Sequence, residues 1–179
     1  LSGRKINDEM ANYISNQILP DIKNVPIKDC LVTIMGVTFK EDCPDMRNSK
    51  VLDIINNLKM SKVKIQITDP IVSPDEVIEA TEIELTDMNN LKPSNIILLA
   101  VAHKDFKALN KKDIKKLLKE DGTFLLHTIG VVDKPTPPNK FINKYIFPGG
   151  ICPSFSQIIE PIEKTGLIVA DIETLIRHY

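Results

Sequence analysis

The segment that most constrains the fold is residues 30–37, an almost continuous apolar run. Strands buried on both faces of a helix-covered parallel sheet have this composition, whereas half-exposed strands alternate apolar and polar residues. Residues 95–102 form a second run of the same kind. Residues 63–68 alternate and stop at Asp69-Pro70, which is typical of a strand that leads into a turn. These segments together predict a sheet with a buried centre.

Helical patterns separate the expected strands. Residues 5–19 carry apolar side chains at intervals of three and four, the spacing of an amphipathic helix. Ser49 is a suitable helix cap, and apolar residues with the same spacing follow it over 51–58. Further short helices and a last strand are expected at 74–80, 113–118 and 123–127. Strands that alternate with helices predict an α/β fold, a Rossmann-like doubly wound parallel sheet, here preceded by a helix.

The last part of the chain has a different composition. Three prolines lie within 135–138, and Ser154 is placed to cap a helix that ends at Gly166. A strand is expected at 167–169. We therefore expect an irregular α+β extension after the sheet. The expected divisions are a helix with its linker, the Rossmann-like domain and the extension, at 1–28, 29–130 and 131–179.

Composition narrows the classes of function. The formal net charge is −1, so the chain lacks the large basic field that collects nucleic acid. Its three cysteines are odd in number and lack metal-ligand spacing, so we expect no metal site and a reducing, cytoplasmic location. No apolar run is long enough for a membrane span. The sequence does not begin with Met, as in a piece of a longer product, a processed chain or an incomplete gene model.

Two cations follow the first buried strand. Lys40 and Arg47 lie between that strand and the helix after Ser49, and Asp45 is placed to orient Arg47. In an open parallel sheet, ligands bind outside the carboxyl ends of the strands, and a diphosphate requires cations and backbone N–H groups. A solvated loop with one salt bridge is the alternative explanation. The glycine-rich dinucleotide fingerprint Gly-x-Gly-x-x-Gly does not occur in the chain.

The complete string favours the ligand-binding explanation. Gly36-x-x-Phe39-Lys40, then Asp45-x-Arg47-x-Ser49, a helix and a strand ending in Asp69-Pro70 resemble the UDP-binding C-terminal domain of the UDP-glucose/GDP-mannose dehydrogenase family. The resemblance covers residues 3–118 and includes the end of the family's central dimerisation helix. It implies that Phe39 and Lys40 contact a UDP-sugar. It implies that Arg47 reaches NAD and that Asp45 and Ser49 support the loop.

The resemblance also implies what the whole enzyme does. Family members oxidise the C6 alcohol of a nucleotide sugar to a uronate, a precursor of polysaccharides, with NAD bound by an N-terminal domain. That domain and the catalytic Cys have no counterpart here, so we expect no catalytic residue and no oxidation by this chain alone. The central helix implies a homodimer. His103 and Asp69 remain open: each is a candidate ligand contact, or a capping histidine and a turn residue.

A second resemblance covers residues 115–179. The strings around His127-Thr128-Ile129-Gly130 and Lys144-Tyr145-Ile146-Phe147-Pro148 resemble the late region of cyclopropane-fatty-acyl-phospholipid synthases, which use S-adenosylmethionine. It implies that His127, Ile129 and Tyr179 are remnants of a bicarbonate site. The family's Cys, Glu and glycine-rich loop are missing, so we do not expect S-adenosylmethionine to bind. The chain thus reads as two joined C-terminal pieces, with a methyltransferase fragment or a non-catalytic binding module as alternative functions.

Overall fold

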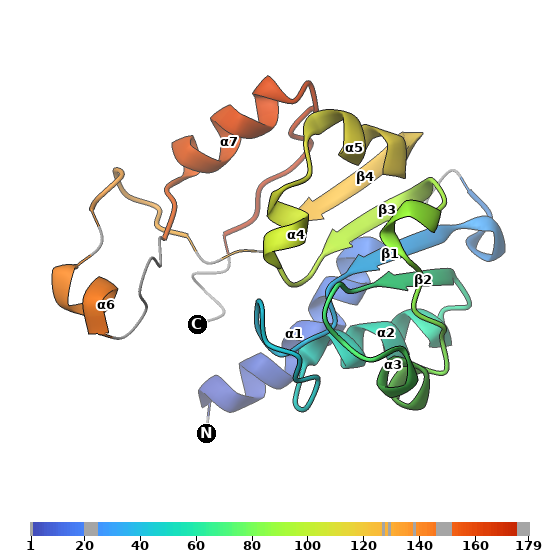
Figure 1. Ribbon diagram of the computed structural model, residues 1–179. Helices are drawn as coiled ribbons and strands as arrows, with labels where there is room; N and C mark the ends of the chain where they lie inside the picture. The colour runs from blue at the N-terminus through green and yellow to red at the C-terminus, as the bar shows by residue number, and fades with distance from the viewer. Residues whose placement is uncertain are drawn as a thin grey trace. The chain divides into compact units, whose positions relative to one another are not determined.

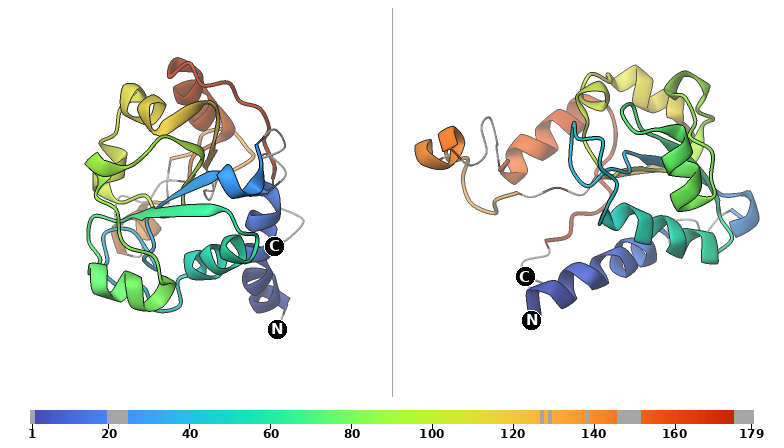
Figure 2. Two further views of the ribbon diagram at one scale, coloured as in Figure 1. Left: turned by 90° about the vertical axis from the view of Figure 1, so that its right-hand side faces the viewer. Right: turned by 60° about the horizontal axis from the view of Figure 1, so that its bottom comes forward.

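The architecture is known from a computed structural model that describes residues 2–19, 25–126, 128, 130–137, 139–145 and 152–174. The chain divides into two compact units, one over residues 1–126 and one over 127–178. The first unit contains the sheet and is shown from three sides in Figures 1 and 2. No helix in the described ranges is long and apolar enough to cross a membrane.

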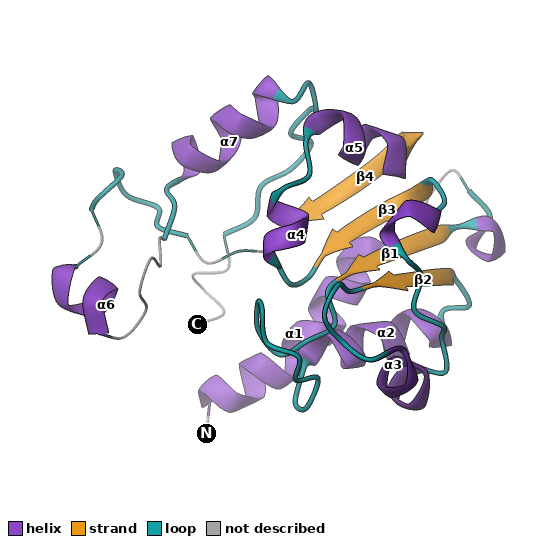
Figure 3. Cartoon of the chain, viewed as in Figure 1, coloured by secondary structure: helices purple, strands orange, loops and turns teal. Residues whose placement is uncertain are grey.

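The first unit is built on a four-stranded parallel sheet with the order β2-β1-β3-β4. Its strands are β1 (Leu31–Met35), β2 (Lys64–Thr68), β3 (Ser94–Leu99) and β4 (Leu118–Leu126). The chain runs from β1 to β2 on one side and then crosses to β3 on the other side. This reversal creates a switch point between β1 and β3, the place where open parallel sheets bind ligands. Figure 3 shows the arrowheads of all the strands at one edge of the sheet.

Helices lie on both faces of the sheet, as the apolar central strands predict (Figure 1). Helices α1 (Ser2–Ile18) and α2 (Lys50–Met60) pack against each other on one side. Helices α4 (Lys104–Lys107) and α5 (Lys111–Leu117) lie on the other. Helix α3 (Pro74–Thr81) follows β2, with Pro74 in its first turn, where a missing N–H does no harm.

The core follows from this layering. Val32, Ile34 and Ile97 are buried completely in the central strands. On the α4 and α5 side, Met35 and Ile97 form a cluster with Phe106. The α/β fold, the parallel sheet and the leading helix are therefore confirmed. The expected helix over 5–19 is α1, whose Ile14 and Ile18 are buried.

The second unit contains helices α6 (Lys140–Tyr145) and α7 (Phe155–Lys164). Ser154 caps α7 through a reciprocal capping box with Gln157, as its position before the apolar residues suggests. The prediction of a strand at 167–169 is wrong, because these residues pair with no strand in the described part of the chain. Apolar β-branched residues favour a strand only where a neighbouring strand and a packed face are present.

Candidate functional site

The candidate site is the loop between β1 and α2, which leaves the sheet at the switch point. Gly36 starts it with a φ of 87°, and its N–H donates to the carbonyl of Thr68 at 2.9 Å. A Cβ at this position would lie 2.6 Å from the Cβ of Val101 and 2.7 Å from its carbonyl oxygen. Glycine is therefore required here for two reasons, the left-handed backbone and the close approach of the segment after β3.

Asp69 anchors the start of the loop from the end of β2. Its side chain is fully buried, and its Oδ2 accepts a hydrogen bond from the Val37 N–H at 2.8 Å. Its Oδ1 accepts from Ile71 N–H at 3.0 Å and from Val72 N–H at 3.3 Å. Asp69 is therefore a turn residue and not a ribose contact, because both oxygens of its buried carboxylate already accept hydrogen bonds from backbone N–H groups.

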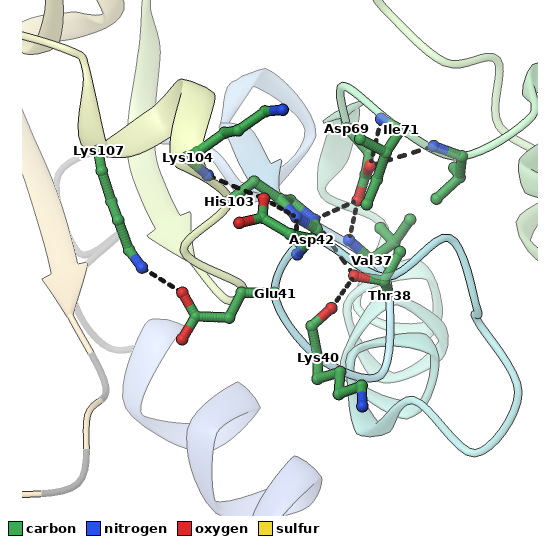
Figure 4. Close-up of polar contacts among 11 residues, drawn as sticks. Val37, Thr38, Lys40, Glu41, Asp42, Asp69, Ile71, His103, Lys104 and Lys107 are labelled. Carbon is green, nitrogen blue, oxygen red and sulfur yellow. Dashed lines mark hydrogen bonds and ion pairs between the residues drawn. The ribbon is translucent and has the colours of Figure 1, made fainter. Parts of the chain in front are cut away.

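His103 lies beneath the same loop and is fully buried (Figure 4). Its Nδ1 accepts a hydrogen bond from the Asp42 N–H at 2.9 Å. Its Nε2 lies 3.1 Å from Asp69 Oδ2 and 3.2 Å from Thr38 Oγ1. Both ring nitrogens are thus engaged within the protein, which excludes the direct ligand contact that its position at a strand end suggested.

The two residues expected to contact substrate lie on the exposed part of the loop. Phe39 is 62% exposed, and its N–H donates to the Asp45 carbonyl at 2.7 Å, which closes the loop on itself. The backbone carbonyl of Lys40 accepts from Thr38 Oγ1 at 2.9 Å. The Lys40 ammonium is exposed and pairs with no acceptor in the described ranges. An aromatic face and a free cation therefore stand together at the carboxyl edge of the sheet.

Arg47 and Asp45 form the pair that the sequence suggested. Arg47 donates from Nε to Asp45 Oδ1 at 3.0 Å and from Nη2 to Oδ2 at 2.8 Å, a bidentate arrangement. The hydrogen bonds from Arg47 lower the pKa of Asp45 to about 2, and the same contacts raise the pKa of Arg47. The Arg47 side chain remains 86% exposed. Asp45 therefore fixes the direction of a guanidinium that is still accessible.

Ser49 contacts the loop that it was expected to support, but it is not the side-chain helix cap that its position suggested. It occupies the position before α2, but its side chain makes no capping hydrogen bond to the helix. Its hydroxyl instead donates to the Thr38 carbonyl at 3.1 Å. The two ends of the loop are thereby tied together, so Ser49 acts on loop shape and not as a side-chain cap.

An open hollow of about 650 Å³ adjoins Arg47 between the loop, α2 and α3. Its lining residues are Pro44, Asp45, Met46, Arg47, Leu52, Glu76, Glu79 and Ala80. Three carboxylates and one cation make this hollow unfavourable for a diphosphate, because like charges repel. The anionic part of a nucleotide is better placed on the Lys40 side of the loop.

The remaining expected site residues lie elsewhere. His127, Ile129 and Tyr179 fall outside the described residues. Thr38, Asp42 and Val101 take part in the site but carried no sequence signal, because their contacts join segments that are far apart in the chain. No group of three or more His, Cys, Asp or Glu side chains in the described ranges is placed to hold a metal ion.

The family model for the UDP binding domain of the UDP-glucose/GDP-mannose dehydrogenase family matches residues 33–134, more than half of the chain. The chain belongs to this family. The match contains all of the sheet except the first two residues of β1, and it contains the whole candidate loop. It extends past the end at 118 that the sequence motifs suggested.

Relatives agree with this assignment. Protein CapL of Staphylococcus aureus is 37% identical over 124 residues, which cover 68% of this chain and 29% of that protein. UDP-N-acetyl-D-glucosamine 6-dehydrogenase of Salmonella typhi is 36% identical over 124 residues, which cover 67% of this chain and 29% of that protein. The chain thus spans less than a third of the length of these relatives.

Solved structures show the same fold. The native UDP-N-acetyl-mannosamine dehydrogenase Cap5O of Staphylococcus aureus superimposes with a TM-score of 0.54 at 26% identity, over 68% of this chain and 31% of that one. UDP-D-ManNAc dehydrogenase of Pyrococcus horikoshii also gives 0.54, at 21% identity, over 65% of this chain and 26% of that one. The second likeness supports the fold alone.

Proposed function

We propose that this chain is the UDP-sugar-binding portion of an NAD-dependent UDP-sugar 6-dehydrogenase that makes uronate precursors of polysaccharides. The observation that carries the proposal is the exposed Phe39 and Lys40 pair, held at the carboxyl end of β1 in a chain that matches a UDP binding domain. Lys40 supplies the charge that a diphosphate needs, and Phe39 supplies an apolar face for the sugar or base.

The described residues fit NAD only at one point. Arg47 presents an exposed guanidinium whose Nε and Nη2 edge is occupied by Asp45, which leaves Nη1 to face an anionic cofactor. NAD supplies the hydride acceptor when it is bound. In the proposed enzyme, Arg47 contributes one contact to it, and a dinucleotide-binding domain of the same enzyme contributes the rest.

We also propose that this chain alone does not oxidise sugars. A catalytic thiolate is needed, and Cys30 is poorly suited to that role. It is fully buried beside the amino end of β1, the opposite edge of the sheet from the loop. Burial raises the pKa of its thiol, which disfavours the nucleophilic thiolate.

A dimer through α1 is part of the same proposal. Met10, Ile14 and Ile18 of this helix are buried, and the helix packs on α2 of its own chain. A partner helix would therefore have to contact the other face of α1. The expectation that S-adenosylmethionine does not bind stays a prediction, which a titration with that ligand tests.

Isothermal titration calorimetry of the 179-residue chain with UDP, NAD and S-adenosylmethionine tests the proposal. We expect heat of binding with UDP, at least a tenfold loss of affinity in Lys40→Ala because a charge-assisted contact contributes about 1.5–3 kcal/mol, and no change in Lys115→Ala, an exposed lysine on α5. Heat of binding with S-adenosylmethionine but not with UDP would favour the methyltransferase explanation. No heat of binding with any of the ligands would reject a nucleotide-binding function for the chain.

A further inference from the structure

His103 is a fully buried titratable ring, and it contacts the loop that carries Phe39 and Lys40. It follows β3, whereas the loop follows β1 and Asp69 follows β2. Figure 4 shows the imidazole where these segments converge. Its exposed fraction is 0%, so it cannot reach a ligand itself. Any role in binding must act through the residues that it holds.

The hydrogen bonds fix which ring nitrogen carries the proton. The Asp42 N–H donates to Nδ1 at 2.9 Å, so Nδ1 presents a lone pair and Nε2 carries the hydrogen. That hydrogen faces Asp69 Oδ2 at 3.1 Å and Thr38 Oγ1 at 3.2 Å. The Thr38 hydroxyl in turn donates to the Lys40 carbonyl at 2.9 Å. The network therefore runs from the Asp42 N–H through the His103 ring and the Thr38 hydroxyl to the Lys40 carbonyl, and each donor in it faces an acceptor.

This network holds both ends of a short segment. Thr38 lies at one end and Asp42 at the other, with Phe39 and Lys40 between them. Asp42 has a φ of 54°, a left-handed conformation that is uncommon for residues with a Cβ and that Asp adopts at a lower cost than most. Its N–H is held by His103, and its carboxylate accepts from the Lys104 N–H at 3.1 Å. Contacts from residues 103 and 104 therefore offset the strain at Asp42.

We propose that His103 is a positioning residue for the UDP-sugar site: its Nδ1 fixes Asp42 and its Nε2–H fixes Thr38 against Asp69, so that Phe39 and Lys40 are held in the binding position before the ligand arrives. This inference rests on the proposed function. Preorganisation raises affinity because the entropy of ordering the loop is lost on folding and not on binding.

Two amide substitutions separate the two ring contacts. In His103→Asn the side-chain oxygen lies near the Nδ1 position and can still accept from the Asp42 N–H. In His103→Gln the side-chain nitrogen lies near the Nε2 position and can still donate to Asp69. Both variants lose ring volume in the same buried place, so both lower stability. Only the Gln variant releases Asp42, whereas in the Asn variant Thr38 loses its contact with the ring but keeps its hydrogen bond to the Lys40 carbonyl.

We expect His103→Gln to weaken UDP binding about tenfold in calorimetry and His103→Asn to weaken it less than about threefold, since tenfold corresponds to about 1.4 kcal/mol, one net hydrogen bond. Hydrogen exchange of the Asp42 amide should accelerate in the Gln variant and stay slow in the Asn variant. If the two variants lose UDP affinity equally, and in proportion to their loss of stability, His103 has only a structural role and the inference is overturned.

Further outcomes separate this inference from the proposed function. UDP binding by the wild-type chain with unchanged affinity in both variants would overturn the inference and leave the proposed function standing. No UDP binding by the wild-type chain would overturn the proposed function and the inference with it. If both His103 variants fail to fold, Thr38→Val decides, because it removes only the hydroxyl that joins His103 to Lys40. Wild-type affinity in that variant would overturn the inference.

Discussion

Single residues determine the shape of the loop between β1 and α2. Gly36 combines a φ of 87° with an approach to Val101 that leaves no room for a Cβ. Arg47 and Asp45 add a bidentate ion pair further along the same loop. The type of each residue was visible in the sequence, but the approach of Val101 was not, because it depends on two strands that are far apart in the chain.

Gly36→Ala tests the backbone requirement. We expect a loss of about 3 kcal/mol in the free energy of unfolding, because a left-handed alanine costs about 1–2 kcal/mol and overpacking against Val101 adds about 1–3 kcal/mol. Urea denaturation followed by circular dichroism measures this loss. Lys115→Ala on the exposed face of α5 is the control and should change stability by less than about 0.5 kcal/mol. A loss in Gly36→Ala as small as the control's would show that the segment after β3 moves aside easily.

The Asp45–Arg47 pair predicts a specific acid titration. The pKa of Asp45 is lowered to about 2, so the pair contributes to stability above the ordinary value of 3.8 and loses that contribution as the pH falls through about 2. Carboxyl-carbon NMR should place the Asp45 midpoint near 2, and in Arg47→Gln it should move up toward 3.8. Lys50→Gln serves as control, because Lys50 pairs with Asp53. An identical midpoint in the wild type and in Arg47→Gln would contradict the assigned cause.

Elements with strong periodicity were predicted well, and elements that depend on a partner were not. The expected strands at 30–37, 63–68 and 95–102 are β1, β2 and β3, because burial on a sheet requires their pattern. The strand expected at 167–169 does not form. Helix α4 carried no signal, since it has four residues, too few for a periodic pattern. The same limit applies to the site: Lys40, Asp45 and Arg47 were found from their charge, whereas Thr38 and Asp42 were not, because a buried hydroxyl and a backbone N–H carry their roles.

Asp69 joins three elements and should be costly to remove. In Asp69→Ala the N–H groups of Val37, Ile71 and Val72 lose their acceptor, as does His103 Nε2. Each buried unpaired group costs about 1–3 kcal/mol, and water relieves part of it, so we expect a loss of about 3–5 kcal/mol in the free energy of unfolding.

Asp53→Ala is the matched control for this prediction. Asp53 is 53% exposed and pairs with Lys50 at 3.3 Å. Exposed pairs contribute about 0–1 kcal/mol, so its removal should have little effect in the same urea titration. Similar losses in Asp69→Ala and Asp53→Ala would mean that the buried carboxylate does not hold the loops together.

At the scale of the whole molecule, burial is unevenly distributed between the two units. The first unit contains the hydrophobic core, with Ile34, Ile55, Leu58 and Ile97 at 1% exposure or less. In the described part of the second unit, Ser154 is the single buried residue, and α7 has no buried side chain. Pro161 also removes one backbone hydrogen bond inside α7. The apolar burial that stabilises the fold therefore belongs almost entirely to the first unit.

This distribution predicts that a chain ending at residue 134, where the family match ends, folds and binds like the full chain. Because it keeps the core and the loop with Phe39 and Lys40, we expect its free energy of unfolding to lie within about 1 kcal/mol of the full chain's. We expect its UDP affinity to lie within about twofold, a change of about 0.4 kcal/mol. Urea denaturation and calorimetry measure the two quantities on matched preparations. A loss of more than about 2 kcal/mol in the free energy of unfolding, or a loss of UDP binding, would contradict this prediction. Residues 135–179 bury little surface of their own, so either loss would show that they stabilise the first unit or complete its binding site.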